Sequence, residues 1–212
     1  MKKVLLLTLL LGLFATQVTL GQQKIAGSAH DFSLETWVTD NQICLPCHTP
    51  HDADTAVSDS PLWNHEISAA TYVVYSSPTM DATVGQPAGT SKLCLSCHDG
   101  TIAIDSYGGA TGTTFLVNGT DPGYVGTALN DDHPISFDYN TALSVTDPGL
   151  RDPSGSYTTF LGGSIQDDLL GGGSTMECSS CHDVHNNITT GNTYLLRIDV
   201  ASSVLCLTCH DK

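Results

Sequence analysis

Apolar residues are spread unevenly along the chain, and only one long run of them occurs. The stretch from Val4 to Leu13 is almost wholly apolar and continues to Leu20, whereas the rest of the chain shows no sustained helical or alternating period. The segment between Cys97 and Cys178 is rich in Gly, Thr, Asp and Pro, a composition typical of turns and loops. The pattern predicts a mostly irregular chain with short α-helices, few strands and a polypeptide core too small to fill its own interior.

The apolar run at the N-terminus has the features of a targeting segment. Lys2 and Lys3 precede it, which is the order found in secretory signal peptides. Thr19 and Gly21 are small residues that suit a cleavage after Gly21. The alternative is a transmembrane anchor, but the run is shorter than the roughly 20 residues that a span needs. We therefore expect a signal peptide at 1–21, export of the protein, and a single mature domain at 22–212.

The strongly acidic charge of the chain limits the classes of partner that it can bind. The chain has 7 Lys and Arg residues against 22 Asp and Glu residues, a formal net charge of −15, and losing Lys2 and Lys3 takes it to −17. Nucleic acid is not an expected partner, because binding to phosphates needs a positive surface. In an exported protein the eight cysteines would usually indicate four disulfides, unless their spacing indicates another chemistry.

The cysteines occur in four copies of one pattern, Cys-x-x-Cys-His. About 0.013 copies would arise by chance in a chain of this composition. The pattern is that of c-type haem attachment: two thiols bond the haem, and the histidine becomes the proximal iron ligand. Neither disulfides nor zinc sites need a histidine after every second cysteine. The sequence predicts four covalently bound haem c groups, with thioether bonds from Cys44, Cys47, Cys94, Cys97, Cys178, Cys181, Cys206 and Cys209, and proximal ligands His48, His98, His182 and His210.

The four motifs are of two alternating types. The first and third carry a second histidine three residues on, at His51 and His185, whereas the second and fourth are followed directly by Asp99 and Asp211. This alternation predicts two dihaem units, at approximately 22–110 and 130–212. Residues of the helix-capping type lie three and four positions before each first cysteine, and they predict a short helix at each motif. These residues are Asp40, Asn41, Thr90, Ser91, Ser174, Thr175, Ser202 and Ser203.

The remaining histidines suffice to give every iron a second axial ligand. Beyond the four proximal residues the chain has His30, His51, His65, His133 and His185, one more than four distal sites need. His51 and His185 lie too close to their own motifs to reach the opposite face of the same haem, so we expect each to ligate a neighbouring haem. The residues alone leave open which of His30, His65 and His133 is spare. Iron with two histidine ligands has no vacant position, which favours electron transfer over catalysis.

Several stretches resemble a known family, the multihaem cytochromes with doubled Cys-x-x-Cys-His motifs. Within it, four haems in a chain of this length are similar to the OmcE-like extracellular tetrahaem c-type cytochromes of metal-reducing bacteria, which form filaments. The resemblance spans nearly the whole mature chain. It is carried by residues 27–33, 44–51, 61–65, 91–100, 133–136, 178–185 and 205–212.

The resemblance implies a haem-cored fold and a homopolymer built by head-to-tail contacts. It implies that His51 ligates a haem of the adjacent subunit, with the fourth haem, near the end of the chain, as the expected recipient. Related chains can carry Arg at the position of His65, so the resemblance makes His65 the spare residue and His30, His133 and His185 the distal ligands within the subunit. Implied partners are other multihaem cytochromes and extracellular electron acceptors such as metal oxides, reached by way of the periplasm.

Three other functions fit the same motifs. One is a monomeric periplasmic tetrahaem shuttle, which differs only in assembly. A second is a haem enzyme, which needs one five-coordinate iron and is not what the histidine count predicts. A third is a structural module in which covalently bound haem only stabilises a small core. The Asp-rich loops also make Ca²⁺ a candidate ligand, with solvated loops as the alternative reading.

Overall fold

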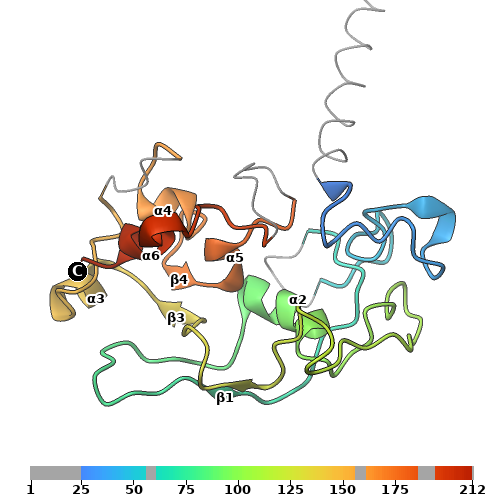
Figure 1. Cartoon of the computed structure of the whole chain (residues 1–212), viewed down its shortest axis with the longest axis horizontal. Helices are drawn as coiled ribbons and strands as arrows, with labels where there is room; N and C mark the ends of the chain where they lie inside the picture. Colours follow the sequence, from blue (N-terminus) through green and yellow to red (C-terminus); the bar gives the residue numbers. More distant parts are fainter. Residues whose placement is uncertain (1–24, 56–60, 156–160, 186–193, 212) are drawn as a thin grey trace, which may run out of the picture.

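The chain is a series of short helices and two-residue strands joined by turns (Figure 1). The computed structural model describes residues 25–55, 61–155, 161–185 and 194–211, so the signal peptide expected at 1–21 lies outside the described residues. The irregular fold class predicted from the sequence is confirmed. In order, the elements are η1 (Thr39–Asn41), β1 (Val73–Val74), α2 (Gly89–His98), β2 (Ala128–Leu129), β3 (Phe137–Asp138), α3 (Thr141–Thr146), α4 (Ile165–Asp168), β4 (Thr175–Met176), α5 (Cys178–Cys181), η2 (Ala201–Ser203) and α6 (Val204–Cys209).

Two small sheets connect segments that are distant in the sequence. Strand β1 pairs with β2 in parallel, with Val73 opposite Ala128, and β3 pairs with β4 antiparallel, with Phe137 opposite Met176. The second sheet ends directly before α5, so it fixes the start of the third cysteine motif. Figure 1 shows α3, α4 and α6 together at one end of the molecule and α2 and α5 near its middle.

Helices α2 and α5, which carry the second and third motifs, are joined by hydrogen bonds. The backbone N–H of Cys178 donates to Ser91 Oγ at 2.9 Å, and the hydroxyls of Thr90 and Ser179 lie 2.7 Å apart. The backbone N–H of Ser91 donates to the Glu177 carboxylate at 3.3 Å. The two middle motifs are therefore held against each other by polar contacts. The division into two dihaem units stays a prediction.

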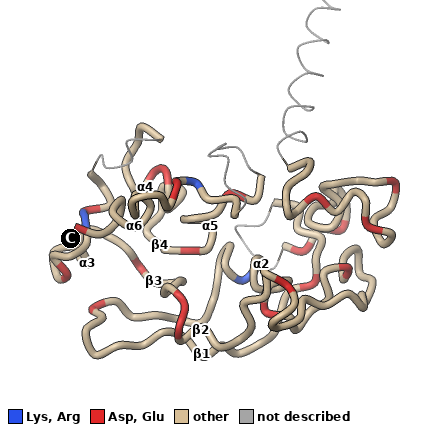
Figure 2. Tube along the Cα trace, in the orientation of Figure 1, with Lys and Arg blue, Asp and Glu red and all other residues tan. Residues whose placement is uncertain are grey.

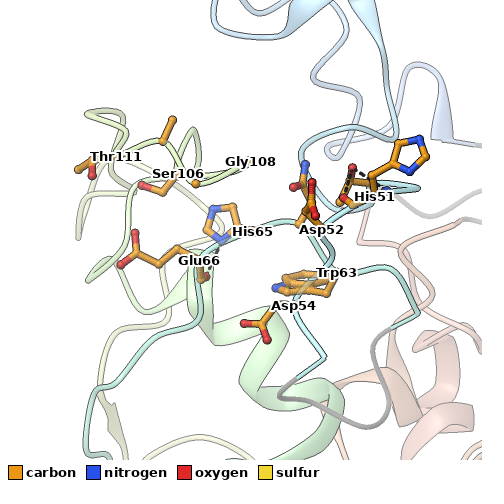
Figure 3. Close-up of a pocket in the computed structure, with 13 residues that line it drawn as sticks. His51, Asp52, Asp54, Trp63, His65, Glu66, Ser106, Gly108 and Thr111 are labelled. Atoms are coloured by element: carbon orange, nitrogen blue, oxygen red, sulfur yellow. Dashed lines mark hydrogen bonds between the residues drawn. The ribbon is translucent and has the colours of Figure 1, made fainter.

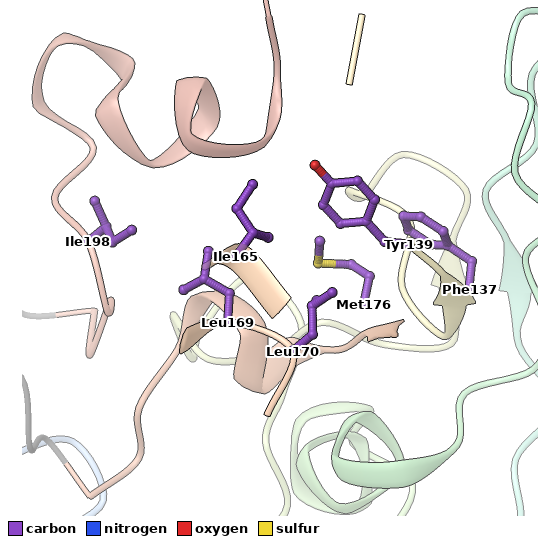
Figure 4. Packing of buried hydrophobic residues seen from close by; sticks show 7 residues of the cluster. All are labelled: Phe137, Tyr139, Ile165, Leu169, Leu170, Met176 and Ile198. Atoms are coloured by element: carbon purple, nitrogen blue, oxygen red, sulfur yellow. The ribbon is translucent and has the colours of Figure 1, made fainter. Parts of the chain in front are cut away.

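A hydrophobic cluster stabilises the C-terminal half (Figure 4). Ile165 is fully buried, and Ile198 and Tyr139 are each 1% exposed. The cluster comprises Phe137, Tyr139, Ile165, Leu169, Leu170, Met176 and Ile198. Six of these residues come from the segment between Cys97 and Cys178 that the sequence pattern indicated as mostly coil. That segment is short of regular structure, as expected, but it supplies most of a small core that the pattern did not predict.

In each motif the backbone forms a hydrogen-bonded helical turn, but only three of the four motifs lie in or against a regular helix. In the first motif the N–H of His48 donates to the carbonyl of Cys44 at 2.8 Å, but no helix forms there. The predicted capping residues were wrong in detail. Helix α2 follows Ala88 and α6 follows Ser203, neither with a side-chain cap, and α5 is capped by a reciprocal pair, Glu177 with Ser180. Glu177 lies directly before the helix, closer to it than the expected Ser174 and Thr175. Its carboxylate therefore accepts from the backbone N–H of Ser180, which has no partner within the helix.

Gly100 ends the chain's longest described helix, α2, at a position where a side chain would not fit. Its φ is +73°, and a Cβ atom there would lie 2.6 Å from the Tyr124 ring and 2.9 Å from the Leu116 carbonyl. We expect Gly100→Ala to lower the free energy of unfolding by at least about 1–2 kcal/mol, the usual cost of the left-handed conformation. Gly109→Ala is the control, because Gly109 has a φ of +76° but open space around it. Urea unfolding of both variants measures the difference, and equal losses would contradict the steric argument.

Acidic side chains are spread over the whole molecule, and basic ones are few (Figure 2). Among the described residues Arg151 pairs with Asp211 at 3.0 Å, and Arg197 Nε donates to the Ser179 carbonyl at 2.6 Å. Both arginines thus hold the C-terminal half together. Within the described part of the chain, no helix has the length and apolar character needed to cross a membrane.

Candidate haem sites

The eight cysteines are all free thiols; six of them are half-buried and two are exposed. Burial is the main cause that raises the pKa of Cys47 to about 11 and the pKa values of Cys97 and Cys209 to about 12. A zinc site would need deprotonated thiolates gathered around one ion. Among the described residues no group of three or more His, Cys, Asp or Glu side chains is arranged to hold a metal ion. The described residues thus show neither a disulfide nor a zinc-type cluster, and no such group for the Ca²⁺ considered from the sequence.

Consecutive motifs lie beside one another. The thiols of Cys94 and Cys178 are hydrogen-bonded, a contact that raises the pKa of Cys94 well above its ordinary value. The pKa of Cys97 is raised first by burial and then by the nearby thiol of Cys47. The pKa of Cys209 is raised in the same way, first by burial and then by the nearby thiol of Cys181. The first motif thus neighbours the second, the second neighbours the third and the third neighbours the fourth.

Three of the four predicted proximal histidines have their Nδ1 atoms fixed by backbone carbonyls. A ring whose Nδ1–H donates to a carbonyl presents its Nε2 lone pair to a metal, which is the arrangement usual for metal-bound histidine. No pattern in the sequence indicates these acceptors, because any residue type supplies a carbonyl. They are Pro61 for His48 at 2.8 Å, Gly123 for His98 at 2.5 Å and Tyr194 for His182 at 2.8 Å.

Three predicted distal histidines face three predicted proximal ones. Two imidazoles bound to opposite sides of one metal have centroids roughly 6.3 Å apart, since each metal–nitrogen bond is roughly 2.0–2.1 Å and the centroid lies roughly 1.1 Å behind the nitrogen. All three observed separations fit that spacing. The pairs are His30 with His98 at 5.9 Å, His48 with His185 at 6.1 Å, and His133 with His210 at 6.5 Å.

The pairing has two consequences for the sequence-based expectations. His185 lies against His48 of the first motif and not against its own motif, as expected for a ligand to a neighbouring haem. The fourth motif, however, already has His133 opposite His210, so it is a poor recipient for His51 of another subunit. Among the described residues, no imidazole ring faces His182. The third motif is therefore the one left without a distal partner, because the nearby His185 is directed to the first motif.

His30 is suited to metal binding by its environment. Burial, followed by the nearby His98, His182 and His185, lowers the pKa of His30 to about 4, so the ring is neutral at pH 7. Neutral imidazole is the form that binds metals. Its buried Nδ1 has no hydrogen-bond partner among the described residues.

His65 has a different environment from the other non-motif histidines. It is 3% exposed, its Nδ1 lies 2.8 Å from the Glu66 carbonyl and its Nε2 lies 3.1 Å from the Ala103 carbonyl. Both ring nitrogens therefore lie within hydrogen-bond distance of backbone carbonyl oxygens. The same ring lies 3.4 Å from Cys97 Sγ, so it packs beside the second motif. This placement suits the role of a spare, structural histidine, which stays a prediction.

A cavity of about 660 Å³ lies beside the first motif (Figure 3). Its lining includes Asp52, Asp54, Trp63, His65 and Glu66. His51 is at its rim, exposed, and its ring is directed away from the other labelled side chains (Figure 3). No ring contact of His51 is seen among the described residues. The structure thus leaves His51 accessible to a second molecule.

Asp105 fastens the loop that follows the second motif. Its carboxylate accepts from the N–H groups of Thr113 at 2.9 Å and Thr114 at 2.8 Å. Burial alone would raise the pKa of Asp105, but these hydrogen bonds outweigh it and lower the pKa below 3.8. Because the folded-state pKa is depressed, the stabilisation is fully present above pH 3.8 and is lost as the pH falls through the lower folded value.

We therefore expect Asp105→Asn to lower the free energy of unfolding at pH 7 by about 1 kcal/mol, after allowance for solvent screening. The difference from wild type should disappear below the folded pKa. Urea unfolding at pH 7 and at a pH well below 3.8 checks this, with the exposed Asp81→Asn as the control. A loss that persists undiminished in acid would contradict the charge-based argument.

Comparison with known families supports the last two of the four motifs. A family model described as the doubled CXXCH motif matches residues 172–212, which hold the third and fourth motifs. A comparison with curated proteins gives no match. The motifs indicate covalently bound haem c, and the paired histidines have the spacing expected of two axial ligands. The doubled motif supports a likeness to the multihaem c-type cytochromes, a class of proteins that acts in electron transfer.

Proposed function

We propose that this protein is an exported tetrahaem electron-transfer protein that polymerises into an extracellular filament. The observation that supports it best is the set of histidine pairs: three pairs have the spacing of two axial ligands, and His182 and His51 are left over. A proximal residue without a distal partner and an exposed candidate ligand are complementary features of one chain. They suit a polymer in which each subunit completes a site of the next.

The residues of the chain have three tasks in this function. Each cysteine pair anchors one haem covalently, each motif histidine binds its iron from one side, and a histidine from elsewhere binds it from the other. Bound haem c supplies an iron that alternates between the ferric and ferrous states and so carries one electron. In the proposed polymer both axial positions of every iron are taken, which leaves no coordination site for a substrate, so an enzymatic function is not proposed.

The short distances between motifs suit transfer from one centre to the next. The Cys94–Cys178 contact and the hydrogen bonds between α2 and α5 hold the two middle motifs together. The shared pair of His48 and His185 binds the first motif to the third. These contacts fix the sites by rigid local structure, so that the order of the centres does not depend on long flexible loops.

Assembly follows from a contact between two different surfaces of neighbouring subunits. His51, in the N-terminal half of one subunit, would bind the iron held by His182 in the C-terminal half of the next. Such a heterologous contact between two different surfaces generates an open fibre unless its rotation closes a ring. Proposed partners are further copies of this chain, other multihaem cytochromes, and acceptors such as metal oxides outside the cell.

The test has two stages. Mass spectrometry of the purified protein should show four covalent haem groups on a chain that begins near residue 22. Electron microscopy of the secreted material should then show filaments whose repeat is one subunit. Four haems on a protein that stays monomeric at high concentration would favour the periplasmic shuttle. Fewer than four haems, or carbon monoxide binding to the assembled, reduced protein, would contradict the bis-histidine assignment.

A further inference from the structure

The second and fourth motifs are followed by the same residue, an aspartate, but the two aspartates lie in different surroundings. Asp99 follows His98, and Asp211 follows His210. Asp99 is 3% exposed as a residue, whereas the side chain of Asp211 is 65% exposed. The sequence repeat therefore presents one carboxylate to the interior and the other to solvent.

The buried carboxylate is held entirely by neutral donors. Its Oδ2 accepts from the hydroxyls of Ser68 and Tyr72, each at 2.6 Å. Its Oδ1 accepts from the backbone N–H of Thr101 at 2.7 Å and from the Thr101 hydroxyl at 2.8 Å. Four donors directed at two oxygens suit an ionised carboxylate, because a protonated one would have to donate and would lose an acceptor position. Among the described residues no cation forms an ion pair with Asp99.

The exposed carboxylate is neutralised. Asp211 Oδ1 lies 3.0 Å from Arg151, and the Arg151 guanidinium also donates to the Leu207 carbonyl at 3.0 Å, which fixes it beside the fourth motif. Solvent screens what charge remains. A buried charge without a counterion acts more strongly on its surroundings than an exposed and paired one, because the local dielectric is lower.

We propose that Asp99 sets the reduction potential of the second haem below that of the fourth. This inference rests on the proposed tetrahaem function. A fixed negative charge beside His98 stabilises the ferric state over the ferrous state, because the ferric state carries one more positive charge. Reduction of that iron by one electron is then less favourable. Asp99 is not an iron ligand in this proposal and acts only through its charge. Ser68, Tyr72 and Thr101 hold its carboxylate in place.

The expected size follows from Coulomb's law. Over the roughly 12 Å that two adjacent extended side chains can span, one charge at an effective dielectric constant of about 20 changes an equilibrium constant about tenfold. We expect Asp99→Asn to raise the equilibrium constant for one-electron reduction of one centre about tenfold, which is 59 mV for a one-electron couple. Asp211→Asn, at the matching position of the repeat, should change its centre by less than about threefold.

The experiment is a redox titration of the full haem-loaded protein followed by proton NMR, in which the haem methyl signals of each centre are tracked separately. Tyr72→Phe distinguishes charge from packing, because it disturbs the same buried network but keeps the carboxylate and three of its donors. It should leave the second centre's potential unchanged or lower it. A rise in Tyr72→Phe equal to that in Asp99→Asn would overturn the proposal in favour of a structural effect.

The wild-type protein gives a test that needs no variant. The second centre should have a lower potential than the fourth, and the reverse order would overturn the proposal. So would an Asp99→Asn protein in which no centre shifts. If the wild-type protein instead carries no haem at the second motif, the proposed tetrahaem function fails first, and this inference fails with it.

Discussion

A His51→Ala protein is expected to be exported and loaded with four haems but to form no filaments. The substitution removes an exposed ring that has no ring contact among the described residues, so the fold of the subunit should be unaffected. It also removes the only ligand that the proposed assembly passes from one subunit to the next. Electron microscopy measures the loss of filaments, and size-exclusion chromatography measures the monomer that remains.

The spectrum of the monomer separates this explanation from a general defect. In the isolated subunit the third iron lacks a distal ligand whether or not His51 is present, so wild-type and His51→Ala monomers should show the same single high-spin centre. His133→Ala is the matched control: it removes the ring 6.5 Å from His210 and should add a second high-spin centre. An additional high-spin centre in the His51→Ala monomer would show that His51 acts within its own subunit.

Mixing wild-type and His51→Ala subunits tests which subunit donates the ligand and which receives it. A His51→Ala subunit keeps its own third motif, so it can receive a ligand but cannot donate one. Small amounts added to wild-type protein should shorten filaments by ending growth at one end. Filaments of unchanged length that incorporate the variant throughout would contradict ligation by His51.

The second large effect concerns stability. Leu169→Ala should lower the free energy of unfolding by about 2–5 kcal/mol, the usual cost of a leucine removed from a packed interior. Leu169 is 5% exposed and packs in the cluster with Ile165 and Leu170. Because the structure cannot collapse fully into the space left, the lost contacts are not regained.

Leu34→Ala is the matched control, since it makes the same chemical change at a residue that is 86% exposed. It should change stability by no more than about 0.5 kcal/mol. Urea unfolding of haem-loaded monomers, followed by Soret absorbance, compares the two variants. A Leu169→Ala protein as stable as the Leu34→Ala protein would mean that haem attachment alone stabilises this half of the chain, and that the polypeptide cluster contributes little.

The amino-acid sequence by itself determined the chemistry of this protein. Thioether attachment needs two thiols and a histidine at a fixed local spacing, and local spacing is fully visible in a sequence. The count of histidines likewise indicated that each iron could have two imidazoles. The irregular fold could also be predicted, because an absent hydrophobic period is a property of the chain and not of its packing.

Only the tertiary structure decided which residues meet. The pairing of His185 with His48 and of His133 with His210 joins positions far apart in the chain, and no local pattern encodes such contacts. The same is true of the core formed by α4 with β3 and β4, because its members are scattered among glycines and polar residues. Asp99 and Asp211 show the limit most directly. The repeat makes them equivalent in sequence, yet burial and neighbouring donors, which depend on the whole fold, leave one charged in the interior and pair the other with Arg151 at the surface.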